Sequence, residues 1–244
     1  DEDILAALEA VASHTGGRDL IIRSNGMKAV ATIMNRMNDP EFLRRCCRFV
    51  VTVCLLRVSA CEDEMLLSGI VEQVVRSLRI AENGGGSTAM PLGAPLAFEA
   101  AQALAFMASF GSYLQDRCRL VHAVHAVRDA LYCHGANPYC AKLCARAVIR
   151  LCENNAVSIR HAEQNGICAA LFDALEVQNA RRNRKDGIPE DLRGAVFEIK
   201  LALNLFEGAE QFSGKDRRRF IPGRASVKGR ADGQGGHSLG SDQS

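Results

Sequence analysis

The stretch NPYCAKLCARAVIRLC, residues 137–152, predicts a helix with one apolar face. Pro138 suits the first turn of a helix, where its missing N–H would be unpaired in any case. The apolar residues after it recur at spacings of three and four, and they are Cys140, Leu143, Cys144, Ala147, Val148, Leu151 and Cys152. Lys142, Arg146 and Arg150 fall on the opposite side. We therefore expect this helix to bury its cysteines and to expose its basic residues.

The cysteines of this helix could belong either to the core or to a metal or redox site. The chain has 10 cysteines and no C-x-x-C motif, whereas zinc sites usually place closely spaced Cys or His pairs in loops. A free cysteine on an apolar helix face behaves as a small hydrophobic residue. The pattern favours core packing and predicts no metal site.

Prolines mark further helices of the same kind. Long helical patterns follow Pro40, Pro95, Pro138 and Pro189, and another helix is expected over residues 4–14 behind Asp3. Aromatic residues make up 5% of the chain and Trp is absent, so Ala, Leu, Val, Ile and Cys must build the core. Such a composition favours closely packed helices over a β-sandwich.

Short glycine-containing pairs precede a second set of apolar helical segments, and they are Asn25-Gly26, Ser68-Gly69 and Asn165-Gly166. A fourth such segment follows Ala123 without a glycine. Gly26 and Gly69 are 43 positions apart, and Ala123 and Gly166 are again 43 apart. The middle interval is lengthened by a loop-like insertion at 82–94, and a second insertion is expected at 179–188.

Each unit is therefore expected to contain a connecting segment, a helix, a turn and a longer helix. A helix pair cannot bury its apolar face alone, and stacking against neighbouring pairs supplies the core. A period near 43 lies in the range of helical solenoids, and no run of residues alternates as a strand would. The predicted fold class is an all-α solenoid.

The units resemble the armadillo repeat family. An Asn-Gly pair, an apolar helix, Asp-Pro at 39–40 or Asn-Pro at 137–138, and then an apolar-faced helix are similar to the second and third helices of an armadillo repeat. The segments LIIRS, EMLLS and SIRHAEQ are similar to its short first helix, which favours this family over the two-helix HEAT repeat. The resemblance covers about residues 1–210 and implies a right-handed superhelix of about four repeats.

Two regions are expected along the chain: a repeat domain at 1–212 and a disordered tail at 213–244. The tail is rich in Gly, Ser and charge and poor in apolar residues. It carries seven Lys or Arg and three Asp or Glu, and because the whole chain has a formal charge of +2, the repeat domain is about −2. Net charge therefore does not favour a nucleic-acid-binding protein.

No secretory leader or membrane-spanning segment is expected. The N-terminus is acidic, and the longest apolar run, FVVTVCLL at 49–56, is too short to span a bilayer. Unpaired cysteines on apolar faces suit a reducing compartment, so we predict an intracellular protein, cytoplasmic or associated with the cytoskeleton. The chain begins without Met, which indicates a fragment of a longer protein.

No motif for catalysis is apparent. His122 and His125 could share a helix face, but without a third partner a structural or surface role is favoured over a metal site. The segment GGGS at 84–87 lacks the Lys and Ser or Thr of a phosphate-binding loop. The sequence therefore predicts no enzyme, no cofactor and no bound metal.

The resemblance implies that the third helices line a concave groove and present their solvent faces to a partner. The corresponding residues here are Arg45, Arg48, Thr52, Gln102, Phe106, Lys142, Arg146, Arg150, Arg193, Lys200 and Asn204, and Glu9, Ser13 and Glu99 fall on the same faces. Since several are Arg or Lys, the expected partner is an acidic or phosphorylated protein segment, with Phe106 as an aromatic anchor. The alternative is that these are ordinary solvated helix faces.

Peptide-binding members of the family carry an asparagine on this helix that clamps the peptide backbone. The matching positions here are Thr52, Phe106 and Arg150, and only Asn204 is close to that motif. This departure argues against a receptor for extended basic peptides.

The predicted function is a non-enzymatic protein-interaction scaffold or adaptor. One alternative is a structural subunit of a large cytoskeletal or ciliary assembly, which would bind through the insertions. Another is a co-chaperone whose armadillo-like domain embraces the nucleotide-binding domain of a chaperone.

Overall fold

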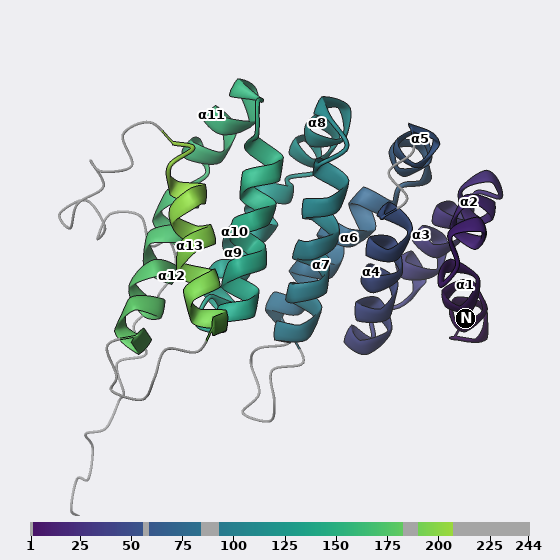
Figure 1. Cartoon of the computed structure of the whole chain (residues 1–244), viewed down its shortest axis with the longest axis horizontal. Helices are drawn as coiled ribbons and strands as arrows, with labels where there is room; N and C mark the ends of the chain where they lie inside the picture. Colours follow the sequence, from purple (N-terminus) through teal and green to yellow (C-terminus); the bar gives the residue numbers. More distant parts are fainter. Residues whose placement is uncertain (1, 56–58, 84–92, 183–189, 207–244) are drawn as a thin grey trace, which may run out of the picture.

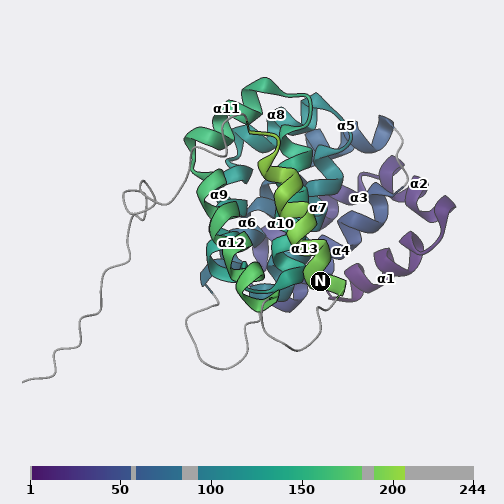
Figure 2. The ribbon, with the colours of Figure 1, turned by 60° about the vertical axis from the view of Figure 1, so that its left-hand side comes forward.

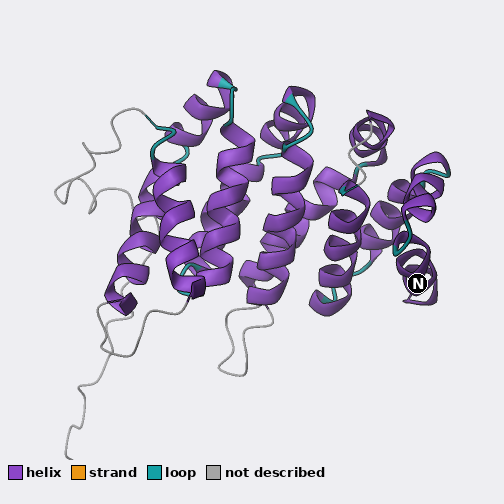
Figure 3. Ribbon diagram, viewed as in Figure 1, coloured by secondary structure: helices purple, strands orange, loops and turns teal. Residues whose placement is uncertain are grey.

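The computed structural model describes residues 2–55, 59–83, 93–182 and 190–206, and it arranges them as stacked helices (Figure 1). These described ranges hold thirteen α-helices and no strand, as Figure 3 shows. The predicted tail at 213–244, Pro189 and most of both insertions lie outside the described residues.

The helix α1 (Glu2–Ala12) comes first, and four groups of three helices follow it. The first helices of the groups are short: α2 (Thr15–Arg23), α5 (Ser59–Ser68), α8 (Ser112–Leu120) and α11 (Ala156–Gln164). The second helices are α3 (Gly26–Arg36), α6 (Ile70–Asn83), α9 (Ala123–His134) and α12 (Ile167–Arg182). The third helices are α4 (Pro40–Cys54), α7 (Gly93–Ala108), α10 (Pro138–Cys152) and α13 (Glu190–Leu203). The predicted solenoid of about four repeats is thus confirmed.

The second and third helices form two layers, and the first helices lie along one edge (Figures 1 and 2). In the layer of third helices, α10 packs between α7 and α13, while α9 packs between α6 and α12 in the other layer. One hydrophobic cluster runs from Leu5 in α1 to Phe206 after α13. Each repeat therefore completes its core against its neighbours, as stacking of helix groups requires.

The helix α10 begins at Pro138, as predicted. The side chain of Asn137 accepts hydrogen bonds from the backbone N–H groups of Tyr139 and Cys140, which caps the first turn. Cys140, Cys144 and Cys152 are each at most 1% exposed. The sulfur atoms of Cys140 and Cys144 are 3.9 Å apart, well beyond a disulfide bond of about 2.05 Å. The interpretation of these cysteines as core residues is confirmed.

Replacing Asn137 by alanine is expected to lower the free energy of unfolding by about 1 kcal/mol, because two backbone N–H groups lose their acceptor. Chemical denaturation measures the effect. The matched control is Asn204→Ala, since Asn204 is an exposed residue after the last turn of α13. Equal effects of the two substitutions would contradict the capping role.

The boundary before each second helix is set by a residue in the left-handed conformation. These residues are Asn25, Gly69, His122 and Gly166, with φ of 55°, 77°, 62° and 74°. Glycine and asparagine tolerate this conformation better than other residues. Asn25 in the first repeat therefore corresponds to Gly69 in the second, whereas the sequence alignment matched Gly26 with Gly69. With this shift of one position, α3 and α6 begin 44 residues apart.

One predicted boundary needs correction, and one helix was not predicted. The helix α7 begins at Gly93, two residues before Pro95, and a Cβ at Gly93 would lie only 2.3 Å from the carbonyl oxygen of Ala81 in α6. Pro95 is still in the first turn, where its missing N–H leaves no bond unmade. The helix α8 was not predicted from the sequence, because its polar segment SYLQDRCRL buries only Leu114, Gln115 and Cys118.

Candidate protein-binding surface

The third helices α4, α7, α10 and α13 carry most of the predicted groove residues, and α1 lies beside α4 at the N-terminal end of this layer (Figure 1). We call the layer the third-helix row. Four of the predicted residues come together around one hollow of about 410 Å³ between α7, α10 and α13, the central depression. It is lined by Gln102, Ala105, Phe106, Ser109, Arg146, Ile149, Arg150, Glu153, Glu198 and Leu201. The structure therefore concentrates on one surface residues that are up to 99 positions apart.

The central depression has an apolar part. Phe106 and Ile149 are half-buried and pack on the hydrophobic core, so their positions are held by the fold. Leu201 on α13 is 41% exposed at the same hollow. Apolar side chains flanked by charged ones are what a protein interface uses to seat an anchor residue.

A second hollow lies toward the end of the row and contains two more predicted residues, Lys142 and Arg193. Its other lining residues are Glu190, Asp191, Gly194 and Phe197. A side chain at Gly194 would come within 3.2 Å of the ammonium group of Lys142, so glycine leaves room for the lysine to cross onto α13. Phe197 is 65% exposed there. Tyr139 of α10 donates a hydrogen bond to Asp191, which ties the two helices at this end.

The remaining predicted residues lie elsewhere on the row. Arg45, Arg48 and Thr52 are on α4, and the Thr52 hydroxyl donates to the carbonyl oxygen of Arg48 at 3.0 Å. Lys200 and Asn204 are exposed at the end of α13. Because the Thr52 hydroxyl already donates its hydrogen within its own helix, it can offer a partner only its acceptor lone pairs.

Ion pairs join neighbouring helices of the row. Arg45 of α4 contacts Glu9 of α1 at 2.6 Å, and Arg48 contacts Glu99 of α7 at 2.9 Å. Arg146 of α10 donates to Glu198 of α13 through Nε at 3.1 Å and also through Nη2. The side chains of Glu99 and Glu198 are only 8% and 12% exposed. These carboxylates therefore depend on their arginines, because a partly buried charge without a partner is costly.

The predicted charge of the surface changes accordingly. Along α4 and α10 the sequence places several arginines on one face, with Glu41 and Glu153 close to them in the chain, and the structure adds a carboxylate from a neighbouring helix beside Arg45, Arg48 and Arg146. Arg150 forms an ion pair of 2.6 Å with Glu153, which directly follows the last turn of the same helix. The positive charge that the sequence predicts along α4 and α10 is therefore largely balanced in the structure, since opposite charges from different repeats meet there.

Positive charge remains at the end of the row near α13. Within the described part of the chain, no carboxylate lies in ion-pair contact with Lys142, Arg193 or Lys200. Glu190 and Asp191 line the same hollow as Lys142 and Arg193, so the charge there is mixed, and the cations of the row that lie outside ion pairs are on α10 and α13.

Glu198 was not identified from the sequence as a residue of this surface. A signal for it was present: Arg48 and Glu99 are 51 positions apart, and Arg146 and Glu198 are 52 apart. Both intervals are one repeat plus an insertion, so each arginine is followed by a glutamate on the next third helix. Comparing the two intervals would have indicated the second ion pair.

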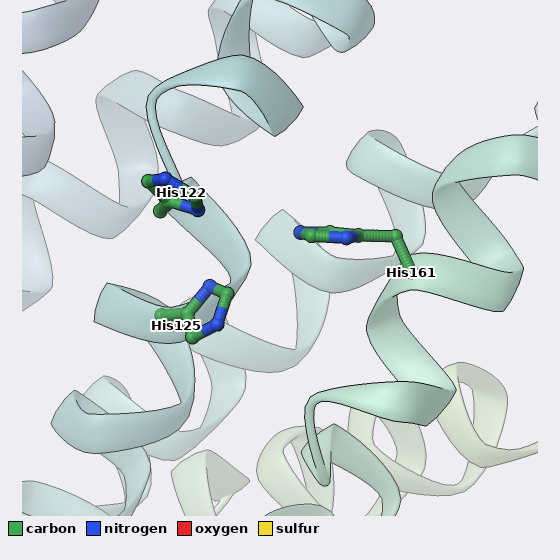
Figure 4. Close-up of side chains that lie close together, drawn as sticks. All are labelled: His122, His125 and His161. Carbon is green, nitrogen blue, oxygen red and sulfur yellow. The ribbon is translucent and has the colours of Figure 1, made fainter.

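The pair His122 and His125 has a third partner in the structure. His161 of α11 points toward both imidazole rings (Figure 4). The ring centroids of His125 and His161 are 5.6 Å apart. The sequence could not show this contact, because it joins helices of different repeats.

No protein-family model and no curated protein sequence matches the chain. Solved structures do resemble it. A designed armadillo repeat protein in complex with the peptide (KR)4 aligns with a TM-score of 0.57 and 15% identity, over 88% of this chain and 87% of that one. Two engineered proteins align with TM-scores of 0.57 and 0.56 and identities of 15% and 16%, over 81% and 82% of this chain and 90% of each of theirs.

These likenesses show the fold, and they confirm the armadillo-like solenoid expected from the repeats. At this identity they carry no information on ligands. No helix in the described ranges combines the length and the apolar character that crossing a membrane requires.

Proposed function

We propose that this armadillo-like solenoid is a non-enzymatic scaffold that binds a segment of another protein along the third-helix row. The observation that supports it most is the central depression, where residues of three helices combine an apolar seat with charged neighbours. An extended segment lying across α7, α10 and α13 would place one apolar side chain against Phe106, Ile149 and Leu201. Its flanking residues would meet the charges of α10 and α13.

The segment is proposed to be acidic or phosphorylated on the side that faces α13. Lys142, Arg193 and Lys200 supply positive charge there, and none of the three is in ion-pair contact with a described carboxylate, although Glu190 and Asp191 line the same hollow as Lys142 and Arg193. Arg150 is 44% exposed, and its pairing with Glu153 is a surface contact that a phosphate could replace at little cost.

An intracellular, cytoplasmic setting is part of the proposal. All ten cysteines are free thiols, and nine of them are buried without a disulfide. Thiols of this number stay reduced in the cytosol, whereas oxidising compartments tend to pair them.

The test is a selection from a displayed library of random peptides on the immobilised protein, followed by calorimetry with synthetic peptides. We expect enriched peptides to contain an apolar residue next to Asp or Glu, and phosphorylated versions to bind more tightly. The variant Lys142→Glu/Arg150→Glu/Lys200→Glu should bind them at least about 10-fold more weakly, with a smaller salt dependence, because attraction is replaced by repulsion.

The control reverses a charge on another face: Lys28→Glu, an exposed residue at the start of α3 in the layer of second helices. It should leave peptide binding unchanged. Peptides that bind the triple variant as well as the original protein would refute the assignment of the surface, and enrichment of basic peptides would refute its charge.

A further inference from the structure

Three histidines from two repeats come together beside the N-terminal end of α9. His122 immediately precedes α9, His125 lies in the first turn of α9, and His161 lies in α11 (Figure 4). One ring nitrogen from each lies within 4.8 Å of the other two. The rings of His122 and His125 are 5.2 Å apart and nearly perpendicular, so their edges can face a common point.

We propose that His122, His125 and His161 form a binding site for a divalent transition-metal ion, with zinc as the natural occupant. Imidazole nitrogens are ligands that zinc, copper and nickel share, and zinc accepts three protein ligands with a fourth position left for water or another group. This proposal stands on other residues than the protein-binding surface and is independent of it.

Within the described residues, two buried ring nitrogens of the histidine cluster lack a hydrogen-bond partner. Nδ1 of His125 and Nε2 of His161 are buried and have no hydrogen-bond partner in the described part of the chain. Buried polar atoms in folded proteins nearly always have a partner, so two orphaned nitrogens in one cluster require an explanation. A metal ion between them would supply the partner to both.

The distances allow an ion after a small adjustment. Zinc–nitrogen bonds of about 2.0–2.1 Å in a tetrahedral site bring ligand nitrogens to about 3.4 Å from one another. The nitrogens here are within 4.8 Å of one another, so the rings would have to close by at most about 1.4 Å. His122 is exposed and can rotate to do so. Asn165 donates to Nδ1 of His161 at 3.3 Å, and this contact would have to open for Nδ1 to hold the proton when Nε2 binds the ion.

The surrounding charges are balanced rather than repulsive. Arg119 and Arg128 are the cations near the cluster, and they pair with Asp116 at 3.4 Å and Asp129 at 2.6 Å. Burial is the main cause that lowers the pKa of His125 and of His161, followed by nearby arginines. The two arginines therefore add little net positive charge beside the three histidines.

The left-handed backbone conformation of His122 also supports a metal site. The other repeats place Asn25, Gly69 or Gly166 at this left-handed position, where those residues are favoured. Histidine is there in one repeat only among the four, next to the histidines that it faces. The fold does not require a histidine at this position, whereas a metal site does.

The experiment uses the protein freed of metal by chelation and titrated with zinc, and with cobalt for its visible absorption. We expect one ion per chain, a cobalt spectrum of nitrogen rather than thiolate ligands, and a melting temperature that rises with added zinc. The variant His122→Gly copies the residue of Gly69 and Gly166, so it should fold normally while it loses one ligand. His161→Ala removes the ligand from the second repeat.

Each variant is expected to bind zinc at least about 100-fold more weakly, since even the loss of an outer-sphere partner costs 10–100-fold. Its melting temperature should no longer respond to zinc. The controls are His14→Ala, at the exposed start of α2, and Cys133→Ala, which removes the exposed thiol. Both should bind as the original protein does. Unchanged affinity in His122→Gly and His161→Ala, loss of binding in Cys133→Ala, or no uptake of zinc would overturn the proposal.

Discussion

Reversing the charge of Arg146 is expected to destabilise the protein by about 3 kcal/mol or more, although Arg146 is on the surface. Its partner Glu198 is 12% exposed at the contact of α10 and α13, and Arg146 holds it with two hydrogen bonds. Arg146→Glu would leave two carboxylates facing each other there. Two like charges at this distance repel each other and disfavour ionisation of both groups, which lowers the free energy of unfolding.

The matched control lies one helical turn further along α10. Arg150→Glu disrupts a pair with Glu153 in which both side chains are more than 40% exposed, so we expect less than about 1 kcal/mol. Urea denaturation of both variants measures the difference, and Arg146→Glu/Glu198→Gln should recover much of the lost stability. Equal effects of the two reversals would contradict the interhelical role of Arg146.

This result bears on how partner binding should be tested. Loss of binding in Arg146→Glu would report a loosened contact between α10 and α13 as much as a lost partner contact. Lys142, Arg150 and Lys200 can be reversed without exposing a buried acid, which is why the binding test uses them.

Under native conditions a maleimide reagent is expected to label one cysteine quickly and the other nine slower by a factor on the order of 10³ or more. Cys133 is exposed, while the other nine are buried in the helix stack. The maleimide reacts with the thiolate, and burial raises the pKa of Cys118, Cys152 and Cys168 to about 12. These thiols can react only when the helices open.

Mass spectrometry of the labelled protein against time gives the rates. In denaturant all ten thiols should react together, and Cys133→Ser should remove the fast phase from the native reaction. Prompt labelling of Cys140, Cys144 or Cys152 would show that α10 does not bury its stripe, and would reopen the question of a thiol site there.

Several features could be predicted from residues close together in the chain. Asn137 and Pro138 start α10 through bonds to the next turn, and the spacing of Cys140, Cys144 and Cys152 specifies its buried side. The boundary of α7 was placed wrongly, because Gly93 rather than Pro95 permits the close approach to Ala81. That contact comes from another helix and leaves no local pattern.

The sequence by itself determined most of the helices, their buried faces and the stacking of four repeats, because these follow from spacings within about 15 residues and from their recurrence at intervals of 43 to 44. Only the tertiary structure decided the charge of the third-helix row and the meeting of the histidines. Arg146 finds Glu198, and His125 finds His161, across the boundary between repeats. The electrostatics of a surface depend on distances between helices, and no pattern within one helix contains those distances.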